Sequence, residues 1–369
     1  MERYDEAYWE GLDREGSYPD EFARAMEEQD LAAAPVPRSY GGPGLGVYDA
    51  SLILEEINAK GGNCQPFHGQ YYLLFSLAKF ASKELKERYL PRIAKGEMRI
   101  QSLALTEPEA GSETAKIRTY ARRERDSYVV KGHKIFISRV ENSDLMVLAA
   151  RTTPYEEVKK KTDGISLFLV PLSEARGIES RRLEMMFNSQ TYELFIDELK
   201  IPAENLIGAE GEGFRYLLNV LNPERILLAS ECIGDARWFI GKSVEYAKER
   251  IVFGRPIGSN QGIQFPIAEA YARLLAAEKV RTSAARLFDS GAVEAAVGEQ
   301  ANVSKFLASE CSWQAANMAM DVHGGSGLAV GSHVERKFRE SRLYRVAPVS
   351  NNLVLAYIAE HVLGLPRSY

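Results

Sequence analysis

Apolar side chains recur every three to four positions through the first 100 residues, with polar side chains between them. In residues 49–57, Asp49 precedes apolar positions at helical spacing, and Gly61 follows shortly afterwards. A capping residue before such a period, with glycine after it, is typical of a helix. We therefore predict a helical domain over residues 1–100, including a helix capped by Asp49.

Between residues 101 and 207 the period shortens to that of strands. Runs rich in β-branched and aromatic side chains fall at residues 128–130, 135–137, 144–150, 164–170 and 192–196. A long helical period returns over residues 208–369, where one face holds Val303, Leu307, Cys311, Ala315, Met318 and Val322. This succession predicts three segregated domains and disfavours a doubly wound parallel sheet.

Composition narrows the class of protein. A chain of 369 residues, 45% of them hydrophobic, is long enough for two or three domains. Its net charge of −5 offers no basic excess for nucleic acid or an anionic membrane, so we expect a small ligand. The cysteines lie far apart, which favours reduced, buried thiols in the cytoplasm over disulfides or a metal site. No apolar run reaches the roughly 18 residues of a membrane span, and the charged N-terminus does not suggest export.

Three glycine clusters carry different predictions. Residues 41–46 and 208–213 lack the GxGxxG spacing, so we predict turns there and disfavour a Rossmann site with NAD. The third cluster, His323 with Gly324 and Gly325, ends a helical pattern. Because glycine has no side chain, a bulky ligand can approach the main chain closely there.

Residues 105–113 read Leu-Thr-Glu-Pro-Glu-Ala-Gly-Ser-Glu. They resemble the Thr-Glu-Pro-x-Ala-Gly-Ser-Asp motif of acyl-CoA dehydrogenases, with Glu113 in place of Asp. Residues 246–257 and 260–264 resemble a second signature of this family, and the resemblance extends from residues 39–42 to residues 365–369. It implies FAD as cofactor and a mixed α and β fold: an N-terminal helical domain, a middle β-barrel-like domain and a C-terminal four-helix bundle.

The resemblance also implies which residues hold the flavin. Four belong to the middle domain: Thr106 beside the pyrimidine, Ser112 at the pyrophosphate or the CoA arm, and Phe136 and Ser138 along the isoalloxazine. Six belong to the C-terminal domain: Arg250, Phe253 and Gln261 at the adenosine diphosphate of a flavin held mainly by a neighbouring subunit, Gly324 and Gly325 at the nucleotide, and Ser350 at the flavin. Asp321 departs from the family's Gln, and its carboxylate would repel a pyrophosphate. Sharing of the flavin implies a homodimer or homotetramer. Without the resemblance, it would be equally reasonable that Arg250 caps the C-terminus of a helix and that Phe253 packs against neighbouring residues.

Desaturation of an acyl thioester requires a carboxylate that removes the α-proton while the β-hydrogen leaves as hydride to flavin N5. Many family members place this Glu late in the chain, but the matching run offers no acid there, whether Arg345, Ala347 or Pro348 holds the position. The isovaleryl and long-chain enzymes instead place the base on a long helix, one residue before an Arg. Glu224 is therefore the predicted base. The alternative is that Glu224 complements a helix N-terminus or pairs with a neighbour.

The surroundings of Glu224 carry further predictions. We expect Pro223 in the first turn of the helix. Glu231, seven residues after Glu224, is a further candidate for the base, but we interpret it as a structural partner. Asn222 and Arg225 match family contacts to the pantetheine arm, and Ser112 is a third predicted substrate contact. Of the histidines, His323 is expected to lie nearest the site. If Pro348 holds the late Glu position, no N–H remains there to polarise the thioester carbonyl.

The function implied is FAD-dependent desaturation of an acyl-CoA, with electrons passed to an electron-transfer flavoprotein. A flavin-dependent oxidase or monooxygenase on the same fold stays open, because the late Glu is missing and Pro348 is unusual. A non-enzymatic flavoprotein, as in relatives that associate with DNA, is disfavoured by the acidic charge.

Overall fold

The computed structural model describes residues 3–367, so residues 1–2 and 368–369 of the chain ends named above lie outside it. Its first helices are α1 (Glu6–Glu15), α2 (Asp20–Glu28), α3 (Val47–Ala59), α4 (Gln65–Phe80) and α5 (Lys83–Ala94). The strands that follow are β1 (Ile100–Ala104), β2 (Tyr120–Glu124), β3 (Ser127–Ser138), β4 (Leu145–Arg151), β5 (Ile165–Pro171), β6 (Ile178–Leu183), β7 (Thr191–Pro202) and β8 (Leu206–Ile207). The remaining elements are α6 (Gly213–Glu249), β9 (Ile251–Val252), β10 (Arg255–Pro256), α7 (Gln261–Asp289), α8 (Glu294–His323), α9 (Gly325–Leu328), α10 (His333–Ser341) and α11 (Asn351–Tyr357). The predicted succession of helices, strands and helices is confirmed.

Helix α3 begins before the predicted cap. Asp49 lies in its first turn, and the backbone N–H groups of Val47 and Tyr48 donate to the carboxylate of Asp289, over 2.7 and 2.9 Å. Asp289 is the last residue of α7, far along the chain. The prediction of Asp49 as the cap was wrong, because a tertiary contact supplies the acceptor that the local pattern assigned to it.

The strands β1–β8 form one sheet in the order β6-β7-β3-β2-β4-β5-β8, with β1 paired in parallel to β4. One face packs against α4, α5 and the start of α6 through a core that includes Leu74, Leu90 and Leu217. The opposite face closes on itself around side chains such as Tyr128 and Phe168. The sheet is therefore barrel-like, and helix α4 lies directly on it.

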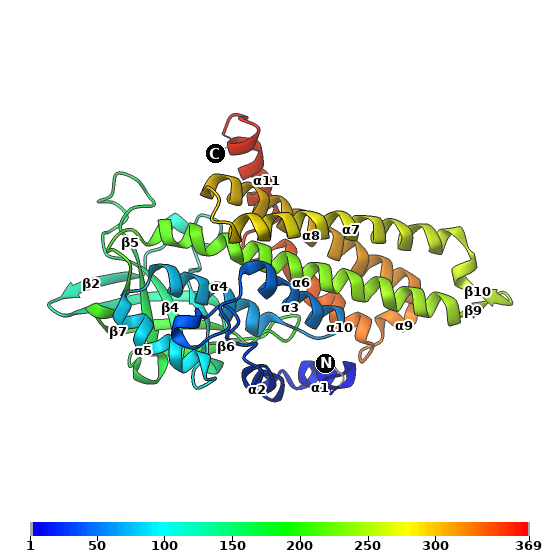
Figure 1. The fold of residues 1–369 in the computed structure, drawn as a ribbon, viewed down its shortest axis with the longest axis horizontal. Helices are drawn as coiled ribbons and strands as arrows, with labels where there is room; N and C mark the ends of the chain where they lie inside the picture. The colour runs from blue at the N-terminus through cyan, green and yellow to red at the C-terminus, as the bar shows by residue number, and fades with distance from the viewer. Residues whose placement is uncertain (1–2, 368–369) are drawn as a thin grey trace.

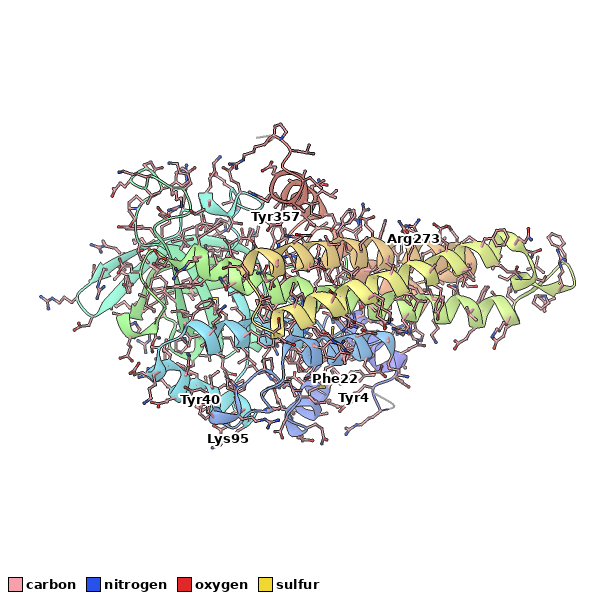
Figure 2. The ribbon with its side chains drawn as sticks, turned by 45° about the horizontal axis from the view of Figure 1, so that its top comes forward. Tyr4, Phe22, Tyr40, Lys95, Arg273 and Tyr357 are labelled. Atoms are coloured by element: carbon pink, nitrogen blue, oxygen red, sulfur yellow. The ribbon has the colours of Figure 1, made fainter. Side chains whose placement is uncertain are left out.

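Helices α6, α7 and α8 are long and lie side by side, and the β9–β10 hairpin joins two of them at the end far from the sheet (Figure 1). In Figure 2, Arg273 marks the flank of α7, and Tyr357 marks the C-terminal segment, which rises from the body. Helix α6 also packs on α3 and α4, so its middle part is buried on several sides.

Pro223 lies in the interior of α6, so its predicted place in the first turn was wrong. The reason is that apolar residues ahead of it, including Leu217 and Val220, extend the helix back to Gly213. Proline has no N–H, so the carbonyl of Asn219 has no intrahelical donor at this point. The irregularity falls one residue before Glu224.

The cysteines Cys64, Cys232 and Cys311 are free and buried, as predicted. Burial comes first among the causes that raise the pKa of each thiol. Across residues 3–367, no helix combines the length and the apolar character that crossing a bilayer requires.

Candidate active site

The Thr-Glu-Pro loop is held by a buried ion pair. Glu107 accepts hydrogen bonds from the backbone N–H groups of Arg118 and Thr119, over 2.6 and 2.9 Å, and from Nζ of Lys134, over 2.8 Å. The same Nζ donates to the carbonyl of Leu105 over 2.9 Å. Burial lowers the pKa of Lys134 to about 8. Burial opposes the charge on Glu107, but Lys134 and the hydrogen bonds from residues 118 and 119 together outweigh burial and lower the pKa of Glu107. These bonds fix the loop to strand β3.

Thr106, Phe136 and Ser138 lie together where this loop meets the end of β3. The N–H of Ile135 donates to the carbonyl of Thr106 over 2.9 Å, which joins the two segments. Phe136 has φ +59° and is 55% exposed, both unusual for an aromatic residue on a strand. A strained, uncovered aromatic ring beside two hydroxyls forms a surface suited to a planar ligand.

Helix α4 lies against this end of the sheet. A Cβ atom at Gly69 would meet the carbonyl oxygen of Gln101 in β1 at 2.9 Å and the guanidinium of Arg139 at 3.2 Å. Arg139 directly follows Ser138, and His68 directly precedes Gly69. Glycine therefore permits α4 to lie close to β1 and to Arg139, the residue that follows Ser138.

Glu224 is buried in the middle of α6, with 1% of it exposed. Nε2 of His68 lies 3.2 Å from Oε1 of Glu224, and Nδ1 of His68 lies 2.5 Å from Oε1 of Glu231. Neither contact has the geometry of a hydrogen bond, and all four carboxylate oxygens are buried without a hydrogen-bond partner. The imidazole thus separates two desolvated carboxylates, and apart from His68 no described residue forms an ion pair or a hydrogen bond with Glu224.

The charge state of this cluster follows from its surroundings. Burial opposes a positive charge on His68, but Glu231 and Glu224 outweigh it and raise its pKa to about 10. Burial, and after it the charge of Glu224, raises the pKa of Tyr72, whose ring lies edge-on to that of His68 with centroids 5.4 Å apart. At neutral pH the cluster therefore contains an imidazolium and a neutral phenol.

Arg250, Phe253 and Gln261 lie at the opposite end of the long helices, around the β9–β10 hairpin (Figure 1). Arg250 is the C-terminal cap of α6, and Gln261 is the first residue of α7. Phe253 has φ +51° and a relative exposure of 101%. An aromatic side chain that its own chain leaves uncovered is available to a second molecule.

Comparisons with known proteins decide the family. Models of the acyl-CoA dehydrogenase N-terminal, middle and C-terminal domains match residues 1–97, 102–199 and 211–363. The acyl-CoA dehydrogenase FadE12 of Mycobacterium bovis is 36% identical over 342 residues, which cover 90% of this chain and 85% of that protein. This chain belongs to the acyl-CoA dehydrogenase family. It is accordingly an oxidoreductase that acts on CH–CH bonds.

Solved acyl-CoA dehydrogenases have the same fold. Butyryl-CoA dehydrogenase from Megasphaera elsdenii matches with a TM-score of 0.90 and 26% identity, over 96% of this chain and 92% of that chain. A glutaryl-CoA dehydrogenase from Mycobacterium smegmatis in complex with FADH2 matches with a TM-score of 0.87 and 25% identity, over 98% and 90%. The predicted fold class is confirmed. The family depends on FAD.

In this acyl-CoA dehydrogenase, the two predicted pantetheine contacts bond to each other. Arg225 donates from Nη2 to Oδ1 of Asn222 over 3.0 Å, and from Nη1 to Oδ1 of Asn302 on α8 over 2.6 Å. Both predicted contacts are more than nine-tenths buried. In this structure, Arg225 and Asn222 therefore hold α6 against α8 beside Glu224.

The remaining predicted residues lie on loops and helix ends. Ser112 is exposed after the Thr-Glu-Pro turn, and Gly324 and Gly325 follow the end of α8. Ser350 caps α11, where its Oγ accepts from the N–H of Leu353 over 3.4 Å. Residues 342–350 contain no acid. Of the two positions expected for the base in this acyl-CoA dehydrogenase, only residue 224 holds a carboxylate.

The sequence analysis missed His68, as it missed Lys134. His68 lies beside Glu224, whereas His323, the predicted nearest histidine, stacks on Tyr246 with ring centroids 4.4 Å apart. The expectation for His323 was therefore wrong. The only signal for His68 is an ionisable residue within the mostly apolar helix α4, because its partners become neighbours only in the fold.

The raised pKa of His68 predicts a dependence of stability on pH. The folded value of about 10 exceeds the ordinary 6.5, so the stabilisation is complete below about pH 6.5 and is lost as the pH rises through 10. Urea unfolding of the wild type and His68→Gln at pH 6, 8 and 10 measures this. We expect the wild type to lose roughly a few kcal/mol of unfolding free energy relative to the variant over this range. Parallel pH dependence in the two proteins would contradict the assigned charge.

Proposed function

We propose that this chain catalyses the FAD-dependent α,β-desaturation of an acyl-CoA thioester, with Glu224 as the base. The observation that carries this proposal is the buried carboxylate of Glu224, whose oxygens have no hydrogen-bond partner while His68 lies 3.2 Å away. A buried carboxylate whose oxygens form no hydrogen bond is suited to remove a weakly acidic α-proton. The absence of an acid from residues 342–350 supports the same assignment.

The predicted flavin contacts fit the cofactor. Phe136 offers an uncovered ring for the flavin plane, and the hydroxyls of Thr106 and Ser138 suit its polar edge. When bound, FAD accepts the β-hydrogen as a hydride at N5. The task left to the protein is to orient the thioester, exclude water and take the α-proton on Glu224, whose burial already excludes water from the carboxylate.

We further propose that the enzyme is a homodimer or homotetramer that shares its flavins and passes electrons to an electron-transfer flavoprotein. Phe253 supports the sharing, because a fully exposed aromatic residue at the tip of the long helices needs a partner surface. Arg250 and Gln261, at the same tip, offer a planar cation and an amide for phosphate and adenosine.

Arg250→Ala is expected to weaken FAD retention without unfolding the chain. Loss of a charge-assisted contact to phosphate should raise the dissociation constant for FAD by about 10- to 100-fold. Titration of deflavinated protein with FAD, followed by fluorescence, measures this. Arg122→Ala, an exposed arginine on β2, is the matched control and should bind FAD as the wild type does. Equal affinities in the two variants would argue against flavin sharing through this tip.

The proposed reaction is tested on the holoenzyme under anaerobic conditions. Purified protein should be yellow and should bleach with at least one member of a panel of short, branched, aromatic and long acyl-CoAs, with the enoyl-CoA appearing in equal amount. Peroxide or oxygen incorporation on admission of air, without another acceptor, would instead support an oxidase or monooxygenase. Failure of every acyl-CoA to bleach the flavin would overturn the proposal.

A further inference from the structure

His68 lies between the two acidic side chains of α6 that face α4. Glu224 and Glu231 are seven residues apart, which places them two turns apart on one helix face. His68 contacts one through each ring nitrogen, and none of the three residues is more than 9% exposed. Among the described residues, His68 alone forms an ion pair with either carboxylate.

Two buried carboxylates on one face are unfavourable without a cation between them. Burial disfavours each charge, and each charge disfavours the other, so one of the two would take up a proton. A protonated Glu224 has no capacity to accept the α-proton. The ability of Glu224 to accept a proton therefore depends on the group that lies between Glu224 and Glu231.

Other polar groups around the pair are less directly placed. Within residues 3–367, seven such groups interact electrostatically with one of its members: Tyr72 on α4, Cys64 just before α4, Arg139 after β3, Arg225 and Cys232 on α6, Lys305 on α8 and Tyr344 after α10. Arg225 is engaged by Asn222 and Asn302, and Nζ of Lys305 donates to Oδ1 of Asn351 over 2.6 Å. Asp235 and Lys337 form a separate ion pair at 2.5 Å. None of these groups forms an ion pair with either acid in the part of the chain that the structure describes.

We propose that His68 is a positioning residue for the reaction: held as an imidazolium by Glu231, it keeps Glu224 ionised and fixed in place to receive the substrate's α-proton. This inference rests on the proposed function. In the step itself, the proton passes from the α-carbon to an oxygen of Glu224, and the electron pair of the broken bond stays on the substrate. The imidazolium neither gains nor loses a proton.

The test compares His68→Gln, Glu231→Gln and the double variant as holoenzymes. Glutamine at residue 68 retains an N–H donor but not the charge, so the acidic limb of the kcat/KM profile should move up by at least about one pH unit. The rate at pH 7 should fall roughly tenfold or more. In the double variant the repulsion between the carboxylates is gone, so part of this shift should be reversed.

The matched control is His133→Gln. His133 also contacts a glutamate, with Nε2 lying 2.8 Å from Oε1 of Glu193, but on a partly exposed strand. This variant should keep the wild-type pH profile. An unmoved acidic limb in His68→Gln, or no recovery in the double variant, would overturn the positioning role even if the rate falls.

Two measurements report the charges without turnover. The chain has five histidines, so ¹⁵N-histidine NMR, assigned with His68→Gln, follows the ring directly. We expect an imidazolium at pH 8 in the wild type and a neutral ring in Glu231→Gln. Infrared difference spectra should show the carbonyl stretch of a protonated carboxyl group at pH 7 in His68→Gln but not in the wild type.

These outcomes separate the two proposals. A neutral His68 at pH 8 in the wild type, with an inactive Glu224→Gln, would overturn the inference and leave the proposed function standing. The NMR and infrared results could instead behave as expected while Glu224→Gln stays fully active. That outcome would overturn the proposal that Glu224 is the base.

Discussion

Glu224→Gln should lose about 10³- to 10⁴-fold in the rate of anaerobic flavin bleaching by an acyl-CoA and still bind FAD. Glutamine has the shape of glutamate, but its amide does not accept a proton at neutral pH. The oxygens of Glu224 form no hydrogen bond, and the substitution leaves His68 paired with Glu231, so we expect the fold to persist. Rapid mixing measures the bleaching, and the flavin absorbance and the thermal midpoint show whether FAD and the fold remain.

Glu231→Gln is the informative comparison, because it removes a carboxylate from the same helix face and leaves the proposed base. Its bleaching rate should fall far less than that of Glu224→Gln. A Glu224→Gln enzyme within tenfold of wild type would require another base. Glu340 is poorly suited to that part, because Arg336 and Lys337 hold its oxygens at 2.7 and 3.0 Å.

The three zones of the fold were predictable because periods of about 3.6 and 2 residues repeat over long stretches. One error arose because a distant residue supplied a helix cap, and another because Pro223 was read as a helix start despite the apolar positions ahead of it. Asp289 caps α3 from the end of another helix, and apolar residues ahead of Pro223 extend α6 beyond the expected start. The contact of Asp289 is not visible in any short window of sequence, whereas the apolar residues that extend α6 lie only a few positions before Pro223.

The site was predictable only in part. The position of Glu224 followed from a family resemblance, and its burial followed from the apolar run after it. His68 and Lys134 were missed, since each is a single ionisable residue in an element read as a core segment. Their carboxylate partners lie on other elements, and only packing brings the charges together. Spacing along the chain carries no signal for such pairs.

Lys134→Met should destabilise the middle domain by about 3–5 kcal/mol and weaken FAD binding. Lys134 is fully buried, and its removal leaves the carboxylate of Glu107 buried without a cation. That carboxylate also accepts the N–H groups of residues 118 and 119, so its protonation or movement would loosen the loop that carries Thr106. Urea unfolding of the FAD-free protein and titration with FAD measure the two effects.

Lys131→Met is the control on the same strand. Lys131 pairs with Asp197 and Glu198 on the surface, where ion pairs contribute about 0–1 kcal/mol, so this variant should unfold close to wild type. Glu107→Gln in the Lys134→Met background should recover part of the lost stability, because it removes the unpaired charge and keeps one oxygen acceptor for the amides. If Lys134→Met unfolded like Lys131→Met, the buried pair would not be what fixes the Thr-Glu-Pro loop. A double variant no more stable than Lys134→Met would instead attribute the loss to packing of the lysine side chain.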